Sequence, residues 1–258
     1  MKRQPDVLLG HEKFDIVDMT AVSGDKILLT SYKEKKVLLV DSKTDTVLSE
    51  IVLQAKPQSI CMVESQQAAT TLNTKQIQFL KVKETRLTTD GVLDVDVDVR
   101  GIAAHKNNIV LSYSSPAGVK IISKKGKVIH TLNNTRAGRK VLKEPECIAT
   151  ASDDSIYVTD WRTNKITRLD SSLTILYTIA WPMLDDPCGI ISMNRDQLLV
   201  CNYDNIVLIE LSSSSMTVIL DKQHGVERPC SICFCKEQNK LYVAPVVETF
   251  NIMVYKLL

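Results

Sequence analysis

The sequence predicts an all-β fold, a six-bladed β-propeller in which each blade is a four-stranded antiparallel sheet. Three observations predict it: a unit of short strands joined by polar turns, the return of that unit every 41 to 46 residues, and a spare extended segment near the N-terminus. The chain has 258 residues, enough for one large all-β domain with its own core. We therefore expect residues 1–258 to form a single domain.

The repeating unit is clearest between Pro145 and Asp170. It starts with Pro145-Glu-Cys-Ile-Ala-Thr, continues after a polar turn with Ile156-Tyr-Val-Thr-Asp, and ends with Asn164-Lys-Ile-Thr-Arg-Leu-Asp. Runs of β-branched and aromatic residues bounded by Asp, Ser and Asn are typical of short strands joined by turns. The same order returns from Pro187-Cys-Gly-Ile and from Pro229-Cys-Ser-Ile.

The period of the repeat gives the number of blades. An apolar residue marks the register of each first strand, and the marks are Met19, Ile60, Ile102, Ile148, Ile190 and Ile232. Their spacings are 41, 42, 46, 42 and 42 residues, which predicts six blades that start near residues 16, 57, 99, 145, 187 and 229. Helical repeats have shorter periods, and the sequence shows no helical periodicity.

The last unit lacks a fourth strand, because the sequence ends soon after Ile252-Met-Val-Tyr. An extended segment at residues 6–14 precedes the first unit and has no blade of its own. We expect residues 6–14 to supply the outer strand of the last blade and so to close the ring. Closure would remove the unpaired strand edges that an open ring would leave.

Composition limits the classes of function. The net charge is +2 and the pI is about 8.1, a weaker basic bias than a dedicated nucleic-acid binder usually shows. The N-terminal apolar run, Val7 to Leu9, is too short for a signal peptide or a membrane span. Seven cysteines, an odd number, indicate reduced thiols. We expect a cytoplasmic protein with no membrane partner.

The pattern Pro-x-x-Ile, then Ile-Tyr-Val-Thr-Asp, then Asn-Lys-Ile-Thr-Arg-Leu-Asp resembles an NHL repeat, best in the fourth unit and fairly in the fifth and sixth. In the first three units the acidic residue matched by Asp160 is replaced, by Ser31 in the first. NHL repeats form six-bladed propellers, often at the C-terminus of tripartite-motif (TRIM-NHL) ubiquitin ligases. The resemblance implies substrate or partner recognition, sometimes RNA binding, and it does not imply ligase activity for this chain.

Catalytic propellers hold calcium or zinc in the channel through Asp, Glu, Asn or His near the starts of the inner strands. Five of the inner strands expected here begin with small and apolar residues, at Ser59, Gly101, Cys147, Gly189 and Ser231. The four histidines, His11, His105, His130 and His224, fall in unrelated places, and only Cys230, Cys233 and Cys235 approach a zinc motif. We therefore predict no enzyme, no metal, and no small-molecule or other cofactor. A metal-dependent hydrolase or lyase remains a second alternative, which bound metal would support.

Loops at one end of a propeller usually carry recognition. Aromatic residues recur just past the second strand of several units, at Tyr32, Tyr113, Trp161 and Tyr203, and basic residues lie beside them at Lys33, Arg100, Arg162 and Arg228. Packing of these rings between blades is the competing interpretation, whereas aromatic anchors beside charges are typical of binding surfaces. Acidic residues in the same loops balance the basic ones, which favours a protein partner over a polyanion. Single-stranded RNA on the same face is the first alternative.

The connection between the third and fourth units is about four residues longer than the others and is basic. It contains Arg136, Arg139, Lys140 and Lys143. These residues form a candidate contact for an acidic ligand, although an exposed run of charge is more often simply solvated.

Overall fold

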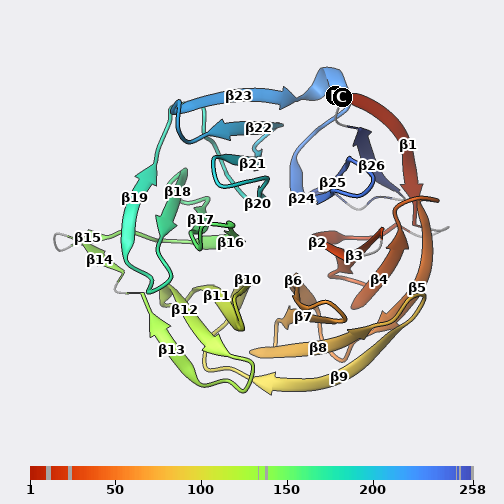
Figure 1. Ribbon diagram of the computed structural model, residues 1–258, viewed down its shortest axis with the longest axis horizontal. Helices are drawn as coiled ribbons and strands as arrows, with labels where there is room; N and C mark the ends of the chain where they lie inside the picture. The colour runs from red at the N-terminus through yellow and green to blue at the C-terminus, as the bar shows by residue number, and fades with distance from the viewer. Residues whose placement is uncertain are drawn as a thin grey trace.

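The computed structural model describes residues 1–9, 13–22, 25–132, 134–136, 139–247, 249 and 251–256. These residues form a ring of six four-stranded antiparallel sheets around a central channel (Figure 1). The predicted fold class is therefore confirmed. Among the described residues no helix has the length and apolar character needed to span a bilayer.

Blade 1 consists of β2 (Ile16–Val22), β3 (Lys26–Ser31), β4 (Lys36–Asp41) and β5 (Thr46–Val52). Blade 2 consists of β6 (Pro57–Glu64), β7 (Gln67–Leu72), β8 (Gln76–Val82) and β9 (Leu87–Asp94). Blade 3 consists of β10 (Val99–His105), β11 (Asn108–Ser114), β12 (Ala117–Ser123) and β13 (Val128–Thr131).

Blade 4 consists of β16 (Pro145–Thr150), β17 (Ile156–Asp160), β18 (Lys165–Leu169) and β19 (Ile175–Ile179). Blade 5 consists of β20 (Ile190–Ser192), β21 (Gln197–Asn202), β22 (Asn205–Glu210) and β23 (Ser215–Leu220). Blade 6 consists of β24 (Pro229–Cys235), β25 (Lys240–Pro245), β26 (Asn251–Lys256) and the N-terminal strand β1 (Lys2–Leu8). A 3₁₀ turn at Lys222–His224 connects blades 5 and 6. The first strands of the six blades start at Ile16, Pro57, Val99, Pro145, Ile190 and Pro229.

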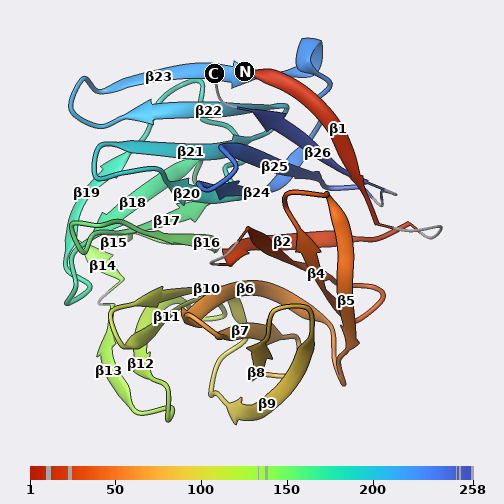
Figure 2. The ribbon, with the colours of Figure 1, turned by 45° about the vertical axis from the view of Figure 1, so that its right-hand side comes forward.

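The ring is closed by β1, which pairs antiparallel with β26 as the outer strand of blade 6. Both chain ends consequently lie together at the rim (Figures 1 and 2). The strand ends at Leu8, so it lies earlier than the predicted segment 6–14. Within it the register shifts between Gln4 and Val7, around Pro5, which lacks the N–H that a regular ladder needs.

The core consists of apolar layers between neighbouring blades. Successive residues of a strand point to opposite faces, so in β3 Ile27 and Leu29 pack toward blade 6 while Leu28 packs toward blade 2. Both faces of the middle strands are buried, which explains their unbroken apolar runs such as Ile27-Leu-Leu in β3. The same arrangement repeats at every junction between blades.

The longer connection between blades 3 and 4 forms a separate two-stranded ribbon, β14 (Thr135–Arg136) and β15 (Arg139–Lys140). It projects from the rim in Figure 1, away from the channel. Lys140 and Lys143 are exposed, and the side chains of Arg136 and Arg139 lie outside the described part of the structure. The predicted contact with an acidic ligand stays a prediction.

Candidate functional site

The loops before the inner strands and the turns after the second strands share one face, which we call the top face. Backbone hydrogen bonds join the two sets in most blades: Tyr32 N donates to Asp15 O (2.9 Å), Tyr203 N to Asp185 O (2.9 Å), and Val246 N to Arg228 O (2.8 Å). The channel opens here, lined by the inner strands β2, β6, β10, β16, β20 and β24, with a volume of about 300 Å³. Antiparallel pairing of first and second strands places these loops at one end of every blade.

Asp18, on β2, accepts hydrogen bonds from three blades. Ser59 Oγ (2.6 Å) and Ile60 N (2.8 Å) of blade 2 donate to Oδ2, and Ser231 Oγ (3.1 Å) of blade 6 donates to Oδ1. Met19 N donates to Oδ1 from its own strand (2.8 Å). Burial raises the pKa of Asp18, and these hydrogen bonds partly offset the rise. The carboxyl group therefore joins blades 6, 1 and 2 at the channel wall.

The residues equivalent to Asp18 in the other blades are small. They are Ser59, Gly101, Cys147, Gly189 and Ser231. A Cβ atom on Gly101 would lie 2.3 Å from Glu146 O, and one on Gly189 would lie 2.7 Å from Cys230 O. These contacts are too close for any side chain, so glycine is required where the inner strands of blades 3 and 4, and of blades 5 and 6, approach each other. Asp18 is the one acid in this layer.

Above this layer the channel widens into a pocket of about 320 Å³, which we call the mouth. Every blade contributes to it, and its charged residues are Asp15, Asp18, Arg100 and Glu146. Tyr32 lies at its edge, with Lys56 Nζ 4.8 Å from the centre of the ring. The mouth thus combines three carboxyl groups, one guanidinium and an aromatic ring.

Glu146 is the least satisfied of these groups. Among the described residues nothing donates a hydrogen bond to its carboxylate, and no ion pair reaches it within 4.0 Å. Its pKa is raised, mainly by burial, while Arg100 lowers it and Glu144, Asp186 and Asp18 raise it further. Arg100 instead donates from Nε to Ser114 Oγ (3.4 Å).

Three thiols from blades 4, 5 and 6 also line the mouth: Cys147, Cys188 and Cys230. Cys188 Sγ donates to Pro229 O (3.3 Å), and Cys230 Sγ donates to Ile16 O and Pro245 O (3.3 Å each). Burial raises the pKa of Cys147 and of Cys230 well above the ordinary thiol value. Both are therefore protonated at neutral pH, a state unsuited to nucleophilic attack or metal binding.

One group of potential metal ligands lies elsewhere, where blades 6 and 1 meet below the channel. Asp25, Cys235 and Glu237 place their ligand atoms within 4.8 Å of one another. The Asp25 carboxylate is already bound to Lys43 Nζ (2.6 Å) and to Gln238 Nε2 (2.9 Å). These contacts favour a structural role for the group.

Exposed apolar side chains gather on the top face of blades 4, 5 and 6, and we call this set the apolar arc. It consists of Trp161 (39% exposed), Met183 (60%), Tyr203 (49%), Val246 (45%) and Val247 (59%). Exposed apolar residues that cluster in this way mark interaction sites more often than scattered ones do.

Hydrogen bonds connect the loops of the arc. Asn164, in the turn of Trp161, donates from Nδ2 to Asp185 Oδ1 (2.9 Å), and Asp186 N donates to Asn164 Oδ1 (3.0 Å). Asn202, beside Tyr203, donates from Nδ2 to Met183 O (3.1 Å). These bonds hold the blade 4 and blade 5 loops together, so that part of the arc is preformed.

The structure brings most of the predicted binding residues to this face. Trp161 and Tyr203 are exposed, with the guanidinium groups of Arg162 and Arg228 each 5.9 Å from the respective ring centre. Tyr32 is half-buried at the mouth, and Lys33 and Arg100 are exposed on the blade 1 to 3 side. Their role in binding stays a prediction.

Tyr113 differs from the other aromatics. It is 6% exposed and lies within β11, paired with Gly118 and not in the turn that follows. A Cβ on Gly118 would lie 2.8 Å from Tyr113 Oη, so the ring occupies the space that a side chain at 118 would fill. Tyr113 belongs to the core cluster between blades 2 and 3, as the interpretation that these rings pack between blades expects. It pairs with Val99 as Asp160 pairs with Pro145, so it lies at the place of Asp160 in the second strand and not at that of Trp161 in the turn.

The histidines lie apart from the mouth. His105 ends β10, His130 is on β13 and His224 is in the 3₁₀ turn, where its Nδ1 is 2.8 Å from Asp221 Oδ1. His11 lies outside the described residues.

No protein-family model matches this sequence, and no curated protein sequence matches it either. Solved structures do match. The chain is similar to a streptogramin B lyase with a TM-score of 0.71 and 16% identity, over 97% of this chain and 96% of that chain. It is similar to a catalytically inactive virginiamycin B lyase from Staphylococcus aureus with quinupristin, with a TM-score of 0.69 and 17% identity, over 100% of this chain and 99% of that one.

A third similar structure is the Cps50 (Swd1) β-propeller domain from Myceliophteria thermophila, with a TM-score of 0.66 and 15% identity, over 97% of this chain and 86% of that chain. At these identities the likeness establishes the fold. The six-bladed propeller is thereby supported, and the narrower NHL assignment is not confirmed.

These comparisons contradict the prediction that the chain is not an enzyme, since two of the similar structures are lyases that match it over almost its whole length. The prediction rested on five inner strands and passed over β2. Asp18 lies on β2, directly before the register mark Met19. Comparing this position across all six units would have shown that the first unit has an acid where the others have small residues. The sequence does not single out Glu146, since its lack of a partner depends on distances between blades.

Proposed function

We propose that the top face of blades 4 to 6 binds an extended segment of a partner protein. The observation that carries the proposal is the apolar arc: large exposed apolar side chains on the loops of three consecutive blades, with hydrogen bonds that join the loops of blades 4 and 5. Aromatic residues with polar edges are frequent anchors of such interfaces.

The charges around the arc suit a protein better than a polyanion. Arg162 and Arg228 lie beside the aromatic rings, and Asp185, Asp186 and Glu227 lie in the same loops. A rim of both acidic and basic residues around an apolar centre is usual for protein interfaces. Because the repeat resembles that of TRIM-NHL ubiquitin ligases, the partner could be a protein that such a ligase modifies, and proteins of this class are among the partners to test.

Single-stranded RNA is a second candidate, and the two pairs of an arginine and an aromatic ring favour it. Bases stack on such rings while guanidinium groups contact phosphate. Binding to an unstructured RNA at about 50 and about 200 mM salt tests this candidate, because phosphate contacts make affinity fall steeply with salt.

The test of the main proposal is a selection from a displayed library of random peptides against the purified chain. We expect enriched peptides whose affinity falls at least about tenfold in the Trp161→Ala, Tyr203→Ala double variant, since one interface anchor is worth about 2 kcal/mol and about 1.4 kcal/mol is tenfold. A Tyr177→Ala variant is the matched control, because Tyr177 is an exposed aromatic (37%) on the outer strand β19.

An unchanged affinity in the double variant would overturn the proposal, as would a selection that enriches nothing. The mass of each recovered peptide should be measured as well. Since the same fold also carries lyases, a change in mass would add a chemical step to the binding.

A further inference from the structure

The mouth contains a carboxylate that the folded chain leaves without a partner. Glu146 lines the mouth, and among the described residues no hydrogen bond or ion pair reaches its side chain. A carboxylate that is largely withdrawn from water and accepts no hydrogen bond loses hydration that the attraction of Arg100 offsets only in part, so it lowers the stability of the free protein. Groups kept at such a cost are common in binding sites.

The rest of the mouth makes it a site for a cation. Its charged residues are three carboxylic acids, Asp15, Asp18 and Glu146, and one base, Arg100, a formal sum of −2. Arg100 lowers the pKa of Glu146 through its charge, but among the described residues the two make no ion pair within 4.0 Å, and Arg100 Nε donates to Ser114 Oγ. The other lining groups are the ring of Tyr32, aliphatic side chains such as Val17 and Val246, the polar residues Gln58 and Ser59, and three thiols. An apolar wall with a few convergent carboxylates suits an aliphatic chain that ends in a positive charge.

The mouth is continuous with the apolar arc. Val246 belongs to the arc and also lines the mouth. Cys188 and Cys230 contribute the lining of the mouth from blades 5 and 6. A segment that lies across the arc therefore passes the opening. At about 320 Å³ the mouth is at the small end of ligand pockets, a size for one side chain and not for a folded element.

We infer that the mouth binds a lysine or arginine side chain of the partner segment, with its ammonium or guanidinium group paired to Glu146. The inference rests on the proposed function, because the side chain belongs to the segment held by the arc. A cation would give Glu146 the charge-assisted hydrogen bonds that it lacks. A hard metal ion fits less well, since calcium needs six or more oxygen ligands and the mouth offers thiols and apolar groups.

The experiment uses peptides selected against the wild-type chain. Each basic residue of a selected peptide is replaced in turn by norleucine, and affinity is measured for the wild type and for Glu146→Gln. We expect one basic position whose replacement weakens binding to the wild type about tenfold or more, and by much less in Glu146→Gln. This double-mutant cycle isolates the contact between that cation and Glu146.

Asp98→Asn is the matched control, because Asp98 is an exposed acid before β10 on the same face, outside the lining of the mouth. It removes one negative charge and should keep the full effect of the norleucine replacement. We also expect Glu146→Gln to leave the melting temperature unchanged or to raise it, since it removes a charge that lacks a partner.

Three results would overturn the inference. They are selected peptides without a shared basic residue, an equal norleucine effect in wild type and Glu146→Gln, and a clear fall in the melting temperature of Glu146→Gln. The first two would leave the proposed function standing, because the peptides would still bind. Failure to enrich any peptide would overturn the proposed function itself, so the two failures are distinguishable.

Discussion

At the residue scale, Asp18 shows how one buried acid can hold several blades together. Replacement by alanine removes the acceptor of Ser59 Oγ, Ile60 N and Ser231 Oγ. Buried donors without an acceptor cost about 1–3 kcal/mol, so Asp18→Ala should lower the free energy of unfolding by about 2–3 kcal/mol in urea titrations. A loss below about 0.5 kcal/mol would show that the channel hydrates these donors fully.

The loss in Asp18→Ala should also depend on pH. Because burial raises the pKa of Asp18 in the folded state, the folded chain binds this proton more tightly than the unfolded chain does. The stability that Asp18 contributes is thus fully present below the ordinary carboxyl pKa and decreases as pH rises through the folded-state pKa. The difference between wild type and variant should be larger near pH 4 than near pH 7, and a difference that grows with pH would contradict the raised pKa.

The sequence could predict individual site residues only where the repeat aligned them. Trp161 and Tyr203 follow second strands of ordinary length, so their exposure follows from the register. Tyr113 was misplaced because it pairs with Val99 as Asp160 pairs with Pro145, so it aligns with Asp160 inside the strand and not with Trp161 in the turn. The isolation of Glu146 depends on distances between blades, which no pattern within one blade contains.

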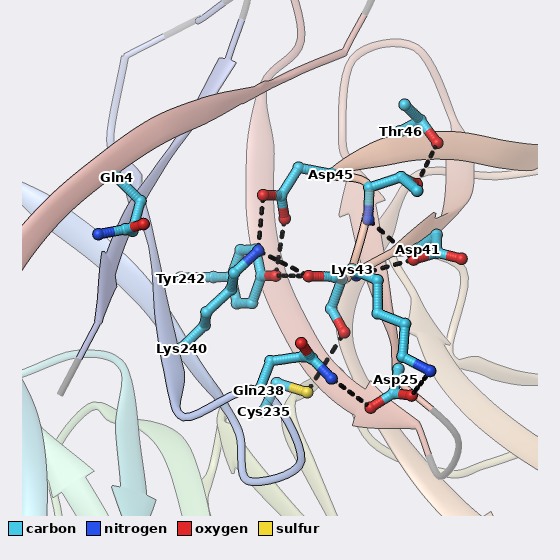
Figure 3. A network of polar contacts seen from close by, with 12 residues as sticks. Gln4, Asp25, Asp41, Lys43, Asp45, Thr46, Cys235, Gln238, Lys240 and Tyr242 are labelled. Carbon is cyan, nitrogen blue, oxygen red and sulfur yellow. Dashed lines mark hydrogen bonds and ion pairs between the residues drawn. The ribbon is translucent and has the colours of Figure 1, made fainter.

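At the scale of elements, the seam between blades 6 and 1 is held by polar contacts that link the β4–β5 turn to β25 (Figure 3). Lys240 Nζ donates to Asp45 Oδ2 (2.7 Å) and to Ser42 O (2.7 Å), and Tyr242 Oη donates to Asp45 Oδ1 (2.9 Å). Lys240 and Asp45 are largely buried, with side chains 13% and 17% exposed. Removing one partner of an enclosed pair costs more than removing one partner of a surface pair, because the remaining buried charge loses its counter-charge.

We expect Asp45→Asn to lower the free energy of unfolding by about 1–2 kcal/mol, because it removes the charge while keeping one acceptor. Asn also tolerates the left-handed backbone of this residue, whose φ is 54°. Asp154→Asn is the control: its φ is 66°, and its ion pair with Lys106 (2.9 Å) is exposed. That change should cost less than about 0.5 kcal/mol. Equal losses in urea titrations would contradict a special role for the seam.

The sequence predicts strands well where turn residues mark their two ends. It predicts them less well at the ring closure and in the connections between blades. The closing strand was expected at residues 6–14, whereas β1 occupies Lys2–Leu8. Pro5 and Asp6 interrupt its alternation, and the shift of register around them lets Val7 still reach the core. The ribbon β14–β15 was not predicted, because two strands of two residues have no periodicity to detect.

At the scale of the whole molecule, the period of 41 to 46 residues was sufficient to predict a closed ring, since six equal units must bury the same two faces against one another. The repeat could not show what the ring binds. Binding is determined by which loops present large apolar side chains and which charges lack partners, and these features differ between blades although the strands are alike.

Ring closure by β1 gives the last prediction. A chain that begins at residue 10 would leave β26 with an unpaired edge and would remove Val7 and Leu9, which are 0% and 5% exposed, from the layer between blades 6 and 1. Each buried side chain is worth about 1.5–3 kcal/mol, so we expect a loss of about 3–6 kcal/mol, a large part of the roughly 5–15 kcal/mol that stabilises a domain. The measurement is urea unfolding followed by tryptophan fluorescence.

A synthetic peptide of residues 1–9 should restore stability to the shortened chain, because the peptide would add as a strand to the open edge. The midpoint should rise with the logarithm of peptide concentration once the peptide exceeds its dissociation constant, as for any ligand that binds only the folded state. A peptide with the same residues in scrambled order should have no effect. An unchanged midpoint in the shortened chain would show that pairing within β24–β26 is sufficient to hold blade 6, and that β1 covers the ring without closing it.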